Sequence, residues 1–528
     1  MDFDYVIVGG GSAGCVLAAR LSEDPAVRVC LVEAGAHDDS LVVKVPLGTA
    51  LMVPSRLRNW AFDTVPQPGL GGRRGYQPRG KMLGGSSSMN AMIYARGDAS
   101  DYDDWAALGA TGWGWNDVLR FFLRAENNER GASALHATGG PLNVADVNTP
   151  NPFARHFVEA AMAAGFPAND DFNGASQEGV GFYQVTQKRG ERWNAARAYL
   201  HPAMQRPNLA VLVEANALRI VMEGRRATGV EIERGGKSEV VRAARAVLLS
   251  AGAFQSPQLL MCSGIGPGRH LQDLGIPVVS DSPEVGANLQ DHLDYVNNRF
   301  CDSTDLLGLS AGGGVRFVRE ILRWRKERKG MLTTNLAEAG GFVKSSPGLA
   351  RPDLQLHFVI GFVDNHGRRM HLGHGFSCHV CVLRPKSRGT VRLATADMRA
   401  APAIDPQFLS AQEDLEAMVA GFKIVRRILD APPLAPFKAR ELYSEAVHTD
   451  PEIEAALRAR ADTIYHPVGT CRMGSDERAV LDPQLRVRGA EALRVVDCSV
   501  MPTLVGGNTN APAIMIGEKA ADLIRNGN

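Results

Sequence analysis

The chain has 528 residues, of which 45% are hydrophobic and 22% charged, the composition of an ordinary globular protein. Its 58 Lys and Arg residues nearly balance 57 Asp and Glu residues, so net charge gives no argument for binding nucleic acid. No apolar run reaches the roughly 18 residues of a membrane-spanning helix, and the N-terminus lacks the pattern of a signal peptide. The 8 scattered cysteines indicate a reducing compartment, so we expect a cytoplasmic protein.

The first elements along the chain form a βαβ unit. Tyr5–Val8 is a short apolar run ended by glycine and predicts a strand. Ser12–Leu21 carries Ala, Val and Leu on one side and predicts a helix, and Val27–Val32 predicts the next strand. A strand, a helix and a second strand in this order indicate a parallel sheet.

Two later passages repeat the strand-to-helix pattern. Ala246–Leu249 leads into a helix at Ser256–Cys262, and Leu493–Val496 leads into a helix at Asn510–Ile524. Sheet elements at the start, middle and end of the chain predict one nucleotide-binding domain made of discontinuous segments. We expect that domain to comprise residues 1–150, 205–296 and 456–528, and a second domain to comprise residues 151–204 and 297–455.

The segment Gly9–Gly14 fits the pattern GxGxxG and joins the first strand to the first helix. Its glycines allow a tight turn, a close approach to a pyrophosphate and close helix packing, and the helix start adds partial positive charge. Glu33 ends the second strand, where its carboxylate can accept hydrogen bonds from a ribose diol. An acid at this place disfavours a 2′-phosphate, so FAD or NAD is expected rather than NADP.

A second glycine-rich segment, Gly80–Asn90, contains Gly84 and Gly85 followed by three serines. Such a backbone can curl around a flat or phosphorylated ligand, and the hydroxyls add donors. On these residues alone, a solvated Gly/Ser loop remains an alternative.

Four longer motifs resemble those of one known family. Gly80–Gly97 resembles the first signature of the glucose-methanol-choline (GMC) oxidoreductases, and Gly252–Gly266 resembles the second. His466–Gly474 and Gly507–Pro512 are similar to the C-terminal catalytic segment of that family. The motifs follow the family's order and spacing through almost the whole chain. The resemblance implies FAD rather than NAD.

The resemblance also implies a fold and a set of cofactor contacts. The fold is α/β, with a discontinuous Rossmann-like FAD-binding domain and a second α+β substrate (cap) domain built on an antiparallel sheet. Asn90 and Ala91 would lie beside the N5 edge of the flavin. The expected FAD-binding residues are Gly9, Gly11, Ser12, Ala13, Gly14, Glu33, Ala34, Arg79, Gly80, Leu83, Gly84, Gly85, Ser86, Met89, Asn90, Ala91, Ala217, Ala251, Gly252, Asp497, Cys498, Asn508, Asn510 and Ala511.

One position departs from the family pattern. Several members carry a histidine covalently attached to the flavin just before the asparagine, and this chain has Met89 there. We therefore expect FAD to be bound non-covalently.

His466 and Asn510 are the predicted catalytic residues. The resemblance places His466 where the family has its catalytic histidine, and a histidine is suited to taking a hydroxyl proton near neutral pH. Asn510 would donate a hydrogen bond to the alkoxide oxygen, giving the family's His/Asn pair. The helix that starts there, with Pro512 in an early position, would direct its positive end at the flavin.

The implied reaction is oxidation of an alcohol to an aldehyde or ketone, with electrons passed to a quinone or another acceptor. An oxygen-using oxidase, a hydroxynitrile lyase and a fatty-acid photodecarboxylase within the same family remain alternatives, as does a flavin protein without turnover. The residues do not identify the alcohol, the acceptor or the oligomeric state. No aromatic-plus-acid pattern argues for a quaternary ammonium substrate.

Three further features of the sequence bear on membrane contact and metal binding. Arg316–Lys329 contains seven basic and two acidic residues among apolar ones, so it predicts an amphipathic helix that could contact an anionic membrane or lie solvated on the second domain. The Cys378 and Cys381 pair lies in a predicted strand, which disfavours a metal or redox role. The loose group of His357, His366, His371, His374 and His379 lacks metal-ligand spacing, so no metal is expected.

Overall fold

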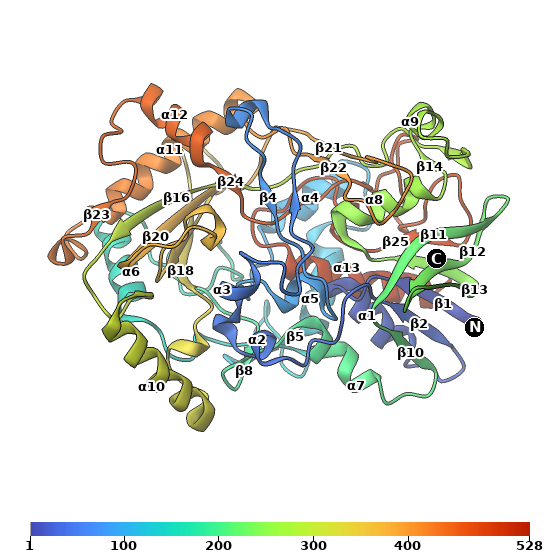
Figure 1. Ribbon diagram of the computed structural model, residues 1–528, viewed down its shortest axis with the longest axis horizontal. Helices are drawn as coiled ribbons and strands as arrows, with labels where there is room; N and C mark the ends of the chain where they lie inside the picture. The colour runs from blue at the N-terminus through green and yellow to red at the C-terminus, as the bar shows by residue number, and fades with distance from the viewer. Residues whose placement is uncertain (1, 528) are drawn as a thin grey trace.

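The computed structural model describes residues 2–527, which form two large β-sheets at opposite ends of the long axis of the molecule (Figure 1). Both chain termini lie near the first sheet (Figure 1). The strands of this sheet run in the order β10 (Leu209–Leu212), β2 (Val29–Val32), β1 (Asp2–Val8), β13 (Lys237–Leu249), β12 (Arg226–Arg234) and β11 (Ala215–Glu223), with β25 (Leu493–Val495) paired to β13.

The predicted βαβ unit is present at the centre of the first sheet. β1 pairs in parallel with both β2 and β13, and helix α1 (Ser12–Leu21) connects β1 to β2. All four residues of β2 are buried, as expected for a parallel strand covered on both faces. Helix α13 (Asn510–Arg525) packs against α1, and α5 (Trp115–Ala125) packs against α13. The prediction of an α/β fold with a Rossmann-like unit is confirmed.

The second sheet is antiparallel, as predicted. Helices α6 (Pro152–Ala163), α11 (Gln412–Leu429) and α12 (Asp450–Arg460) cover one of its faces. Its strands run in the order β23 (Arg440–Glu441), β16 (Leu293–Phe300), β20 (Gly373–Val382), β19 (Leu354–Val359), β18 (Ala337–Val343) and β7 (Gly179–Phe182), with β17 (Gly308–Leu309) on β20 and β24 (Asp462–Thr463) on β16.

Side chains of β19 alternate between the two faces of the second sheet. In β19, Leu354, Leu356 and Phe358 belong to the hydrophobic core, whereas Gln355 and His357 point to the other side. The same alternation puts Cys378 in that core and Cys381 on the opposite face, so the two thiols do not form a joint site. Both cysteines are free and buried.

The division of the chain between the sheets bears on the predicted domains. β16 begins at Leu293 and β24 spans Asp462–Thr463, and both belong to the antiparallel sheet. The edges of the two domains would therefore shift by several residues from 296 and 456, and the division itself remains a prediction. The remaining elements are α2 (Leu41–Lys44), α3 (Thr49–Met52), α4 (Ala99–Ala107), α7 (His201–Ala203), α8 (Gly252–Cys262), α9 (Gly268–Asp273), β3 (Phe62–Asp63), β4 (Tyr76–Gln77), β5 (Glu126–Asn128), β6 (Leu142–Val144), β8 (Gln187–Lys188), β9 (Glu191–Arg192), β14 (Ile265–Gly266), β15 (Ser280–Asp281), β21 (Thr390–Arg392) and β22 (Ala403–Asp405).

The predicted basic helix is α10, which spans Ala311–Glu327 and projects at the surface (Figure 1). Ser310 caps its start by accepting a hydrogen bond from the backbone N–H of Gly313. Arg328 ends the helix in a left-handed conformation, so Lys329 lies beyond it. Within residues 2–527, no helix combines the length and the apolar character needed to cross a membrane.

Candidate active site

A cavity of about 2000 Å³ is lined by the carboxyl ends of β1 and β2 and by residues of the second sheet. Ligand pockets for small molecules usually measure about 300–1,000 Å³. The cavity therefore has room for a dinucleotide together with a small substrate.

The turn after β1 is shaped to hold a phosphate group. A Cβ on Gly14 would lie 1.9 Å from the carbonyl oxygen of Gly9, so only glycine allows α1 to pack this close to the turn. A Cβ on Gly11 would meet only the carbonyl oxygen of Ser250, at 3.7 Å, because Gly11 faces the cavity. No side chain caps the start of α1, which leaves its first N–H groups available to an anion.

Glu33 lies at the cavity wall beside this turn. Its two carboxylate oxygens accept hydrogen bonds from the backbone N–H groups of Gly10, at 2.8 Å, and Gly35, at 2.7 Å. Burial raises the pKa of Glu33 to about 7 despite these two donors. Each oxygen keeps a lone pair for a further donor, such as a ribose hydroxyl.

The glycine-serine loop packs directly on the first turn. The N–H of Gly84 donates to the carbonyl of Gly10 at 2.7 Å, and a Cβ on Gly85 would come within 2.8 Å of the Cα of Gly11. Both glycines have positive φ, 82° and 53°. The loop is therefore part of a rigid cradle, which argues against the alternative of a solvated loop.

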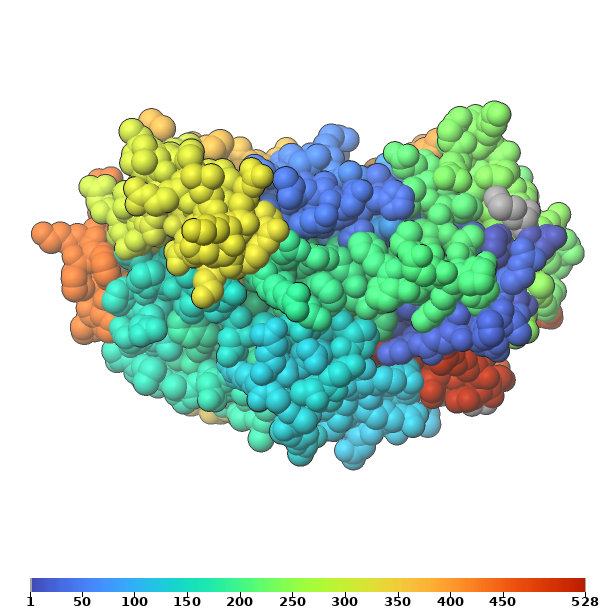
Figure 2. Space-filling model, turned by 90° about the horizontal axis from the view of Figure 1, so that it is seen from below, coloured from blue at the N-terminus to red at the C-terminus, as the bar shows by residue number. Residues whose placement is uncertain are grey.

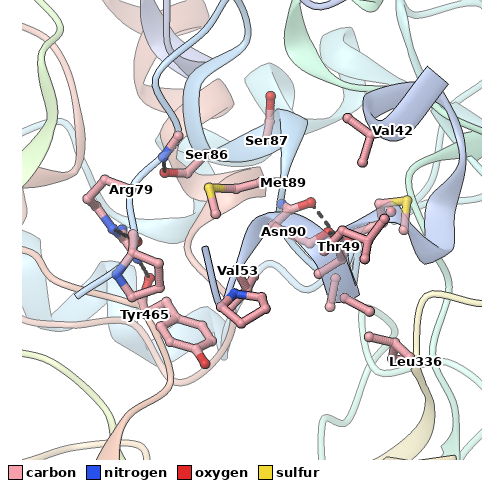
Figure 3. Close-up of a pocket in the computed structure, with 18 of the residues that line it drawn as sticks. Val42, Thr49, Val53, Arg79, Ser86, Ser87, Met89, Asn90, Leu336 and Tyr465 are labelled. Atoms are coloured by element: carbon pink, nitrogen blue, oxygen red, sulfur yellow. Dashed lines mark hydrogen bonds between the residues drawn. The ribbon is translucent and has the colours of Figure 1, made fainter. Parts of the chain in front are cut away.

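Buried Arg192 holds the end of this loop. Its guanidinium donates to the backbone oxygens of Ser87, at 3.2 Å, and Asn90, at 2.7 Å, and to Oδ1 of Asn90 at 2.9 Å. The hydroxyl of Thr49 also donates to the backbone oxygen of Asn90. Figure 3 shows the side chain of Met89, the residue before Asn90, between Arg79 and Asn90. Burial without an acidic partner lowers the pKa of Arg192 to about 9. The sequence analysis did not identify this residue.

Most of the predicted cofactor residues line this one cavity. Asp497 accepts hydrogen bonds from the N–H of Gly252, at 2.9 Å, and from Ser256, at 2.6 Å, and so joins β25 to the start of α8. Four predicted contacts, Gly14, Leu83, Gly84 and Ala511, support the wall from behind without lining it. The predicted residues that line the cavity are Gly9, Gly11, Ser12, Ala13, Glu33, Ala34, Arg79, Gly80, Gly85, Ser86, Met89, Asn90, Ala91, Ala217, Ala251, Gly252, His466, Asp497, Cys498, Asn508 and Asn510.

His466 lies in a chain of hydrogen bonds that defines its proton positions. Nε2 of His292 is 3.0 Å from the carbonyl oxygen of Leu383, and because a carbonyl only accepts, this nitrogen carries a proton. Burial lowers the pKa of His292 to about 3, so its ring is neutral and its Nδ1 is an acceptor. Nδ1 of His466 lies 3.0 Å from that acceptor and therefore donates to it. In neutral His466, Nε2 is left with a lone pair and no proton.

That lone pair accepts a hydrogen bond from Asn508. Nδ2 of Asn508 lies 3.2 Å from Nε2 of His466, and Nε2 of Gln355 donates to Oδ1 of Asn508 at 3.0 Å, which orients the amide. Burial lowers the pKa of His466 well below its ordinary value, and the neighbouring His292 and His357 lower it further. His466 is therefore a neutral base at physiological pH, held beside an amide donor.

Asn510 occupies a different place from the one predicted. Its Oδ1 accepts a hydrogen bond from Ser12 at 2.7 Å, and it begins α13, whereas Asn508 precedes that helix. The structure thus brings Asn508 into contact with His466 and places Asn510 beside the phosphate-binding turn. Both are asparagines within one short motif, so residue type alone could not distinguish them.

Comparison with known proteins shows the family of the chain. Residues 3–294 match the N-terminal model of the GMC oxidoreductases, and residues 385–517 match the C-terminal model. The chain is 50% identical to "Alcohol dehydrogenase [acceptor]" of Pseudomonas putida over 99% of its own length and 95% of that protein. It is 45% identical to mitochondrial choline dehydrogenase of Homo sapiens, over 99% of its length and 90% of that protein.

A solved structure matches over the whole chain at lower sequence identity. A variant of Aspergillus oryzae RIB40 formate oxidase, studied for the modification of its FAD, superposes with a TM-score of 0.92 at 28% identity and covers 100% of this chain and 98% of its own. The chain belongs to the GMC oxidoreductase family, and the family predicted from its motifs is confirmed. It is an FAD-dependent enzyme that acts on CH–OH donors.

Proposed function

We propose that the protein is a dehydrogenase that oxidises an alcohol to an aldehyde or ketone, with His466 as the catalytic base. The observation that carries this proposal is the unprotonated Nε2 of His466, which accepts a hydrogen bond from Nδ2 of Asn508 at the cavity, a contact that a substrate hydroxyl would displace. A hydroxyl bound there would give its proton to Nε2 while its oxygen accepts a hydrogen bond from Asn508. Asn508 takes over the role that the sequence suggested for Asn510.

The neighbouring residues would prepare this pair. His292 fixes the proton of His466 on Nδ1, and Gln355 turns the amide of Asn508 so that Nδ2 is the donor. Asp291 accepts the backbone N–H of His466 at 2.8 Å and so fixes the position of the ring. FAD, when bound, would accept the hydride from the carbon that carries this hydroxyl.

The fit of the cavity to FAD rests on three of its parts. The turn at Gly9–Gly14 and the uncapped start of α1 would hold the pyrophosphate, Glu33 would bind the ribose, and the loop Gly80–Asn90 would contact the flavin. Met89 packs in a cluster with Val43 and Met82 and has no nitrogen that could bond to the flavin. We propose that FAD is held non-covalently.

The electron acceptor is proposed to be a quinone or another compound other than oxygen. In support, a relative 50% identical to this chain is named for an unspecified acceptor. Relatives named "Oxygen-dependent choline dehydrogenase" are 43–44% identical, so the acceptor needs a direct test.

A peripheral contact with an anionic membrane at the cytoplasmic face is proposed for α10. The exposed apolar residues Val315, Val318 and Leu322 follow one another at helical spacing, among several arginines. Figure 2 shows this helix, in yellow, beside the blue segment around residue 50, and residues of both segments line the cavity. A contact there would bring the cavity close to the lipid surface. Flotation with anionic liposomes at low salt tests this, and absence of binding would refute it.

The decisive experiment is anaerobic reduction of the bound flavin by aliphatic, aromatic, sugar and polyol alcohols in the dark. Bleaching by an alcohol is expected, and reoxidation of the reduced enzyme should be faster with a quinone than with oxygen. Bound FAD that no alcohol bleaches in the dark would refute the proposal and would favour a lyase, a photodecarboxylase or a protein without turnover.

A further inference from the structure

The polar face of the second sheet forms part of the cavity wall, and two histidines stand opposite each other on it. His357 in β19 pairs with His379 in β20, and their ring centroids are 6.4 Å apart. Both residues line the cavity. Their backbone register therefore aims two imidazoles at the same part of the substrate space.

Three nitrogens of these rings have no hydrogen-bond partner within the described part of the chain. They are Nδ1 and Nε2 of His357 and Nε2 of His379. His357 is only 3% exposed. A buried polar group without a partner costs about 1–3 kcal/mol, and such groups are rare in folded proteins unless a ligand or water satisfies them. Three of them on one cavity wall indicate a place where a ligand binds.

The chemistry of the rings defines the class of ligand. Burial lowers the pKa of His357 well below its ordinary value, so its neutral ring offers one N–H donor and one acceptor. Nδ1 of His379 donates to Asp294 at 2.6 Å, which leaves its Nε2 as an acceptor when the ring is neutral. A hydroxyl group, which donates and accepts, matches this pair, and a carbonyl oxygen can take the one N–H.

The cavity wall that carries His357 and His379 is poorly suited to bind a cationic group of a substrate. Asp294 is bound to His379 and does not line the cavity. The carboxylates that line it within residues 2–527 already accept hydrogen bonds from protein groups, as do Glu33 and Asp497 near the cofactor and Glu191 and Glu233 beside arginines. A quaternary ammonium has no N–H with which to satisfy the open ring nitrogens, and it would find no free carboxylate on this wall.

The spacing of residues along β19 gives the distance from His357 to the place where the reacting hydroxyl would bind. Gln355 holds Asn508 beside His466, and His357 is the next residue of β19 on the same face, about 7 Å further along. His357 is also close enough to His466 to lower its pKa. A substrate that is a few bonds long can reach both positions at once.

We propose that His357 and His379 bind a second, uncharged oxygen of the substrate, so that the substrate class is an alcohol with a further hydroxyl or carbonyl group. This inference rests on the proposed function, because it names the substrate of the same site. The inference predicts that the enzyme distinguishes a diol from an alkanol of the same length and from choline.

The experiment compares 1,4-butanediol, 1-butanol and choline as reductants of the bound flavin in the wild type and in variants. We expect the wild type to prefer the diol over butanol by at least about 10-fold in kcat/KM, since a site built for a hydroxyl discriminates against the analogue that lacks it. Choline should be the poorest reductant. In His357→Leu the preference for the diol should fall to about 1–3-fold.

Two further variants separate recognition from a general structural effect. His357→Asn retains a donor and an acceptor and should recover part of the preference. Phe358→Leu perturbs the same strand from the hydrophobic face, and it should lower stability while leaving the ratio of the two substrates unchanged. FAD content and Tm are measured for each protein to show that it is folded.

The outcomes distinguish this inference from the proposed function. A wild type that reduces its flavin with butanol as well as with the diol, or a His357→Leu variant with an unaltered ratio, would overturn the inference and leave alcohol oxidation intact. If no alcohol reduces the flavin, the proposed function fails first.

Discussion

The contact between His292 and His466 leads to a prediction about which nitrogen of His466 is the base. In His292→Phe, Nδ1 of His466 loses its acceptor, and the proton is free to move to Nε2, where it blocks the base. Loss of a buried hydrogen bond costs about 1–3 kcal/mol, and each 1.4 kcal/mol corresponds to a factor of ten. We expect flavin reduction by the alcohol to slow by about 5- to 100-fold.

The matched control is His292→Gln. Its side-chain oxygen can accept from Nδ1 of His466, and its amide N–H can donate to the carbonyl of Leu383, so both hydrogen bonds of His292 are replaced. This variant should stay within a few-fold of the wild type. Rapid-mixing measurements of flavin reduction, with FAD content as a check, give both rates.

The pH dependence supplies a second measurement. Burial holds the pKa of His466 well below its ordinary value, so the base should be active and the rate nearly constant across neutral pH. Because His292 helps to lower that pKa, His292→Phe should move the acidic limb of kcat/KM to higher pH. A wild-type rate and pH profile in His292→Phe, or a His292→Gln enzyme as slow as His292→Phe, would refute the argument.

Three further predictions concern the base and the cofactor cradle. His466→Ala should slow flavin reduction by roughly 10²- to 10⁴-fold with FAD content unchanged, and near-normal reduction would exclude His466 as the base. Acid precipitation should release all of the yellow flavin, since Met89 cannot form the histidyl bond, and colour left in the pellet would contradict this. Gly14→Ala should lower FAD content at least about tenfold, because its Cβ would overlap the carbonyl oxygen of Gly9. Gly224→Ala, at an open turn with positive φ, is the control and should keep its FAD.

Local sequence pattern was sufficient to predict the cofactor side of the fold. The run Tyr5–Val8, the glycines that follow and the helix Ser12–Leu21 are adjacent in sequence, so their periodicity and turn chemistry define the βαβ unit directly. The helix Asn510–Arg525 was predicted to within one residue for the same reason. The pattern does not distinguish Asn508 from Asn510, which differ in whether they precede or begin the helix.

The substrate side depends on contacts between distant segments. His292 lies 174 positions from His466, and nothing around His292 in the sequence indicates that the two rings meet. In the sequence, His357 and His379 belong only to a loose group of histidines, because their relation depends on strand register. Within the described residues, no group of His, Cys, Asp and Glu is arranged to hold a metal ion. Arg192 is likewise visible only through the backbone oxygens that it binds.

The strict alternation in β19 separates two kinds of evolutionary change. Leu354, Leu356 and Phe358 hold the helices against the sheet, while Gln355 and His357 point to the other side, where Gln355 holds Asn508 and His357 lines the cavity. A substitution at His357, or at His379 opposite it in β20, can therefore alter what the enzyme accepts without disturbing the packing of the helices on the sheet. Related enzymes could diverge in substrate through the same few codons, and a laboratory library confined to those positions would sample new specificities at little cost in stability.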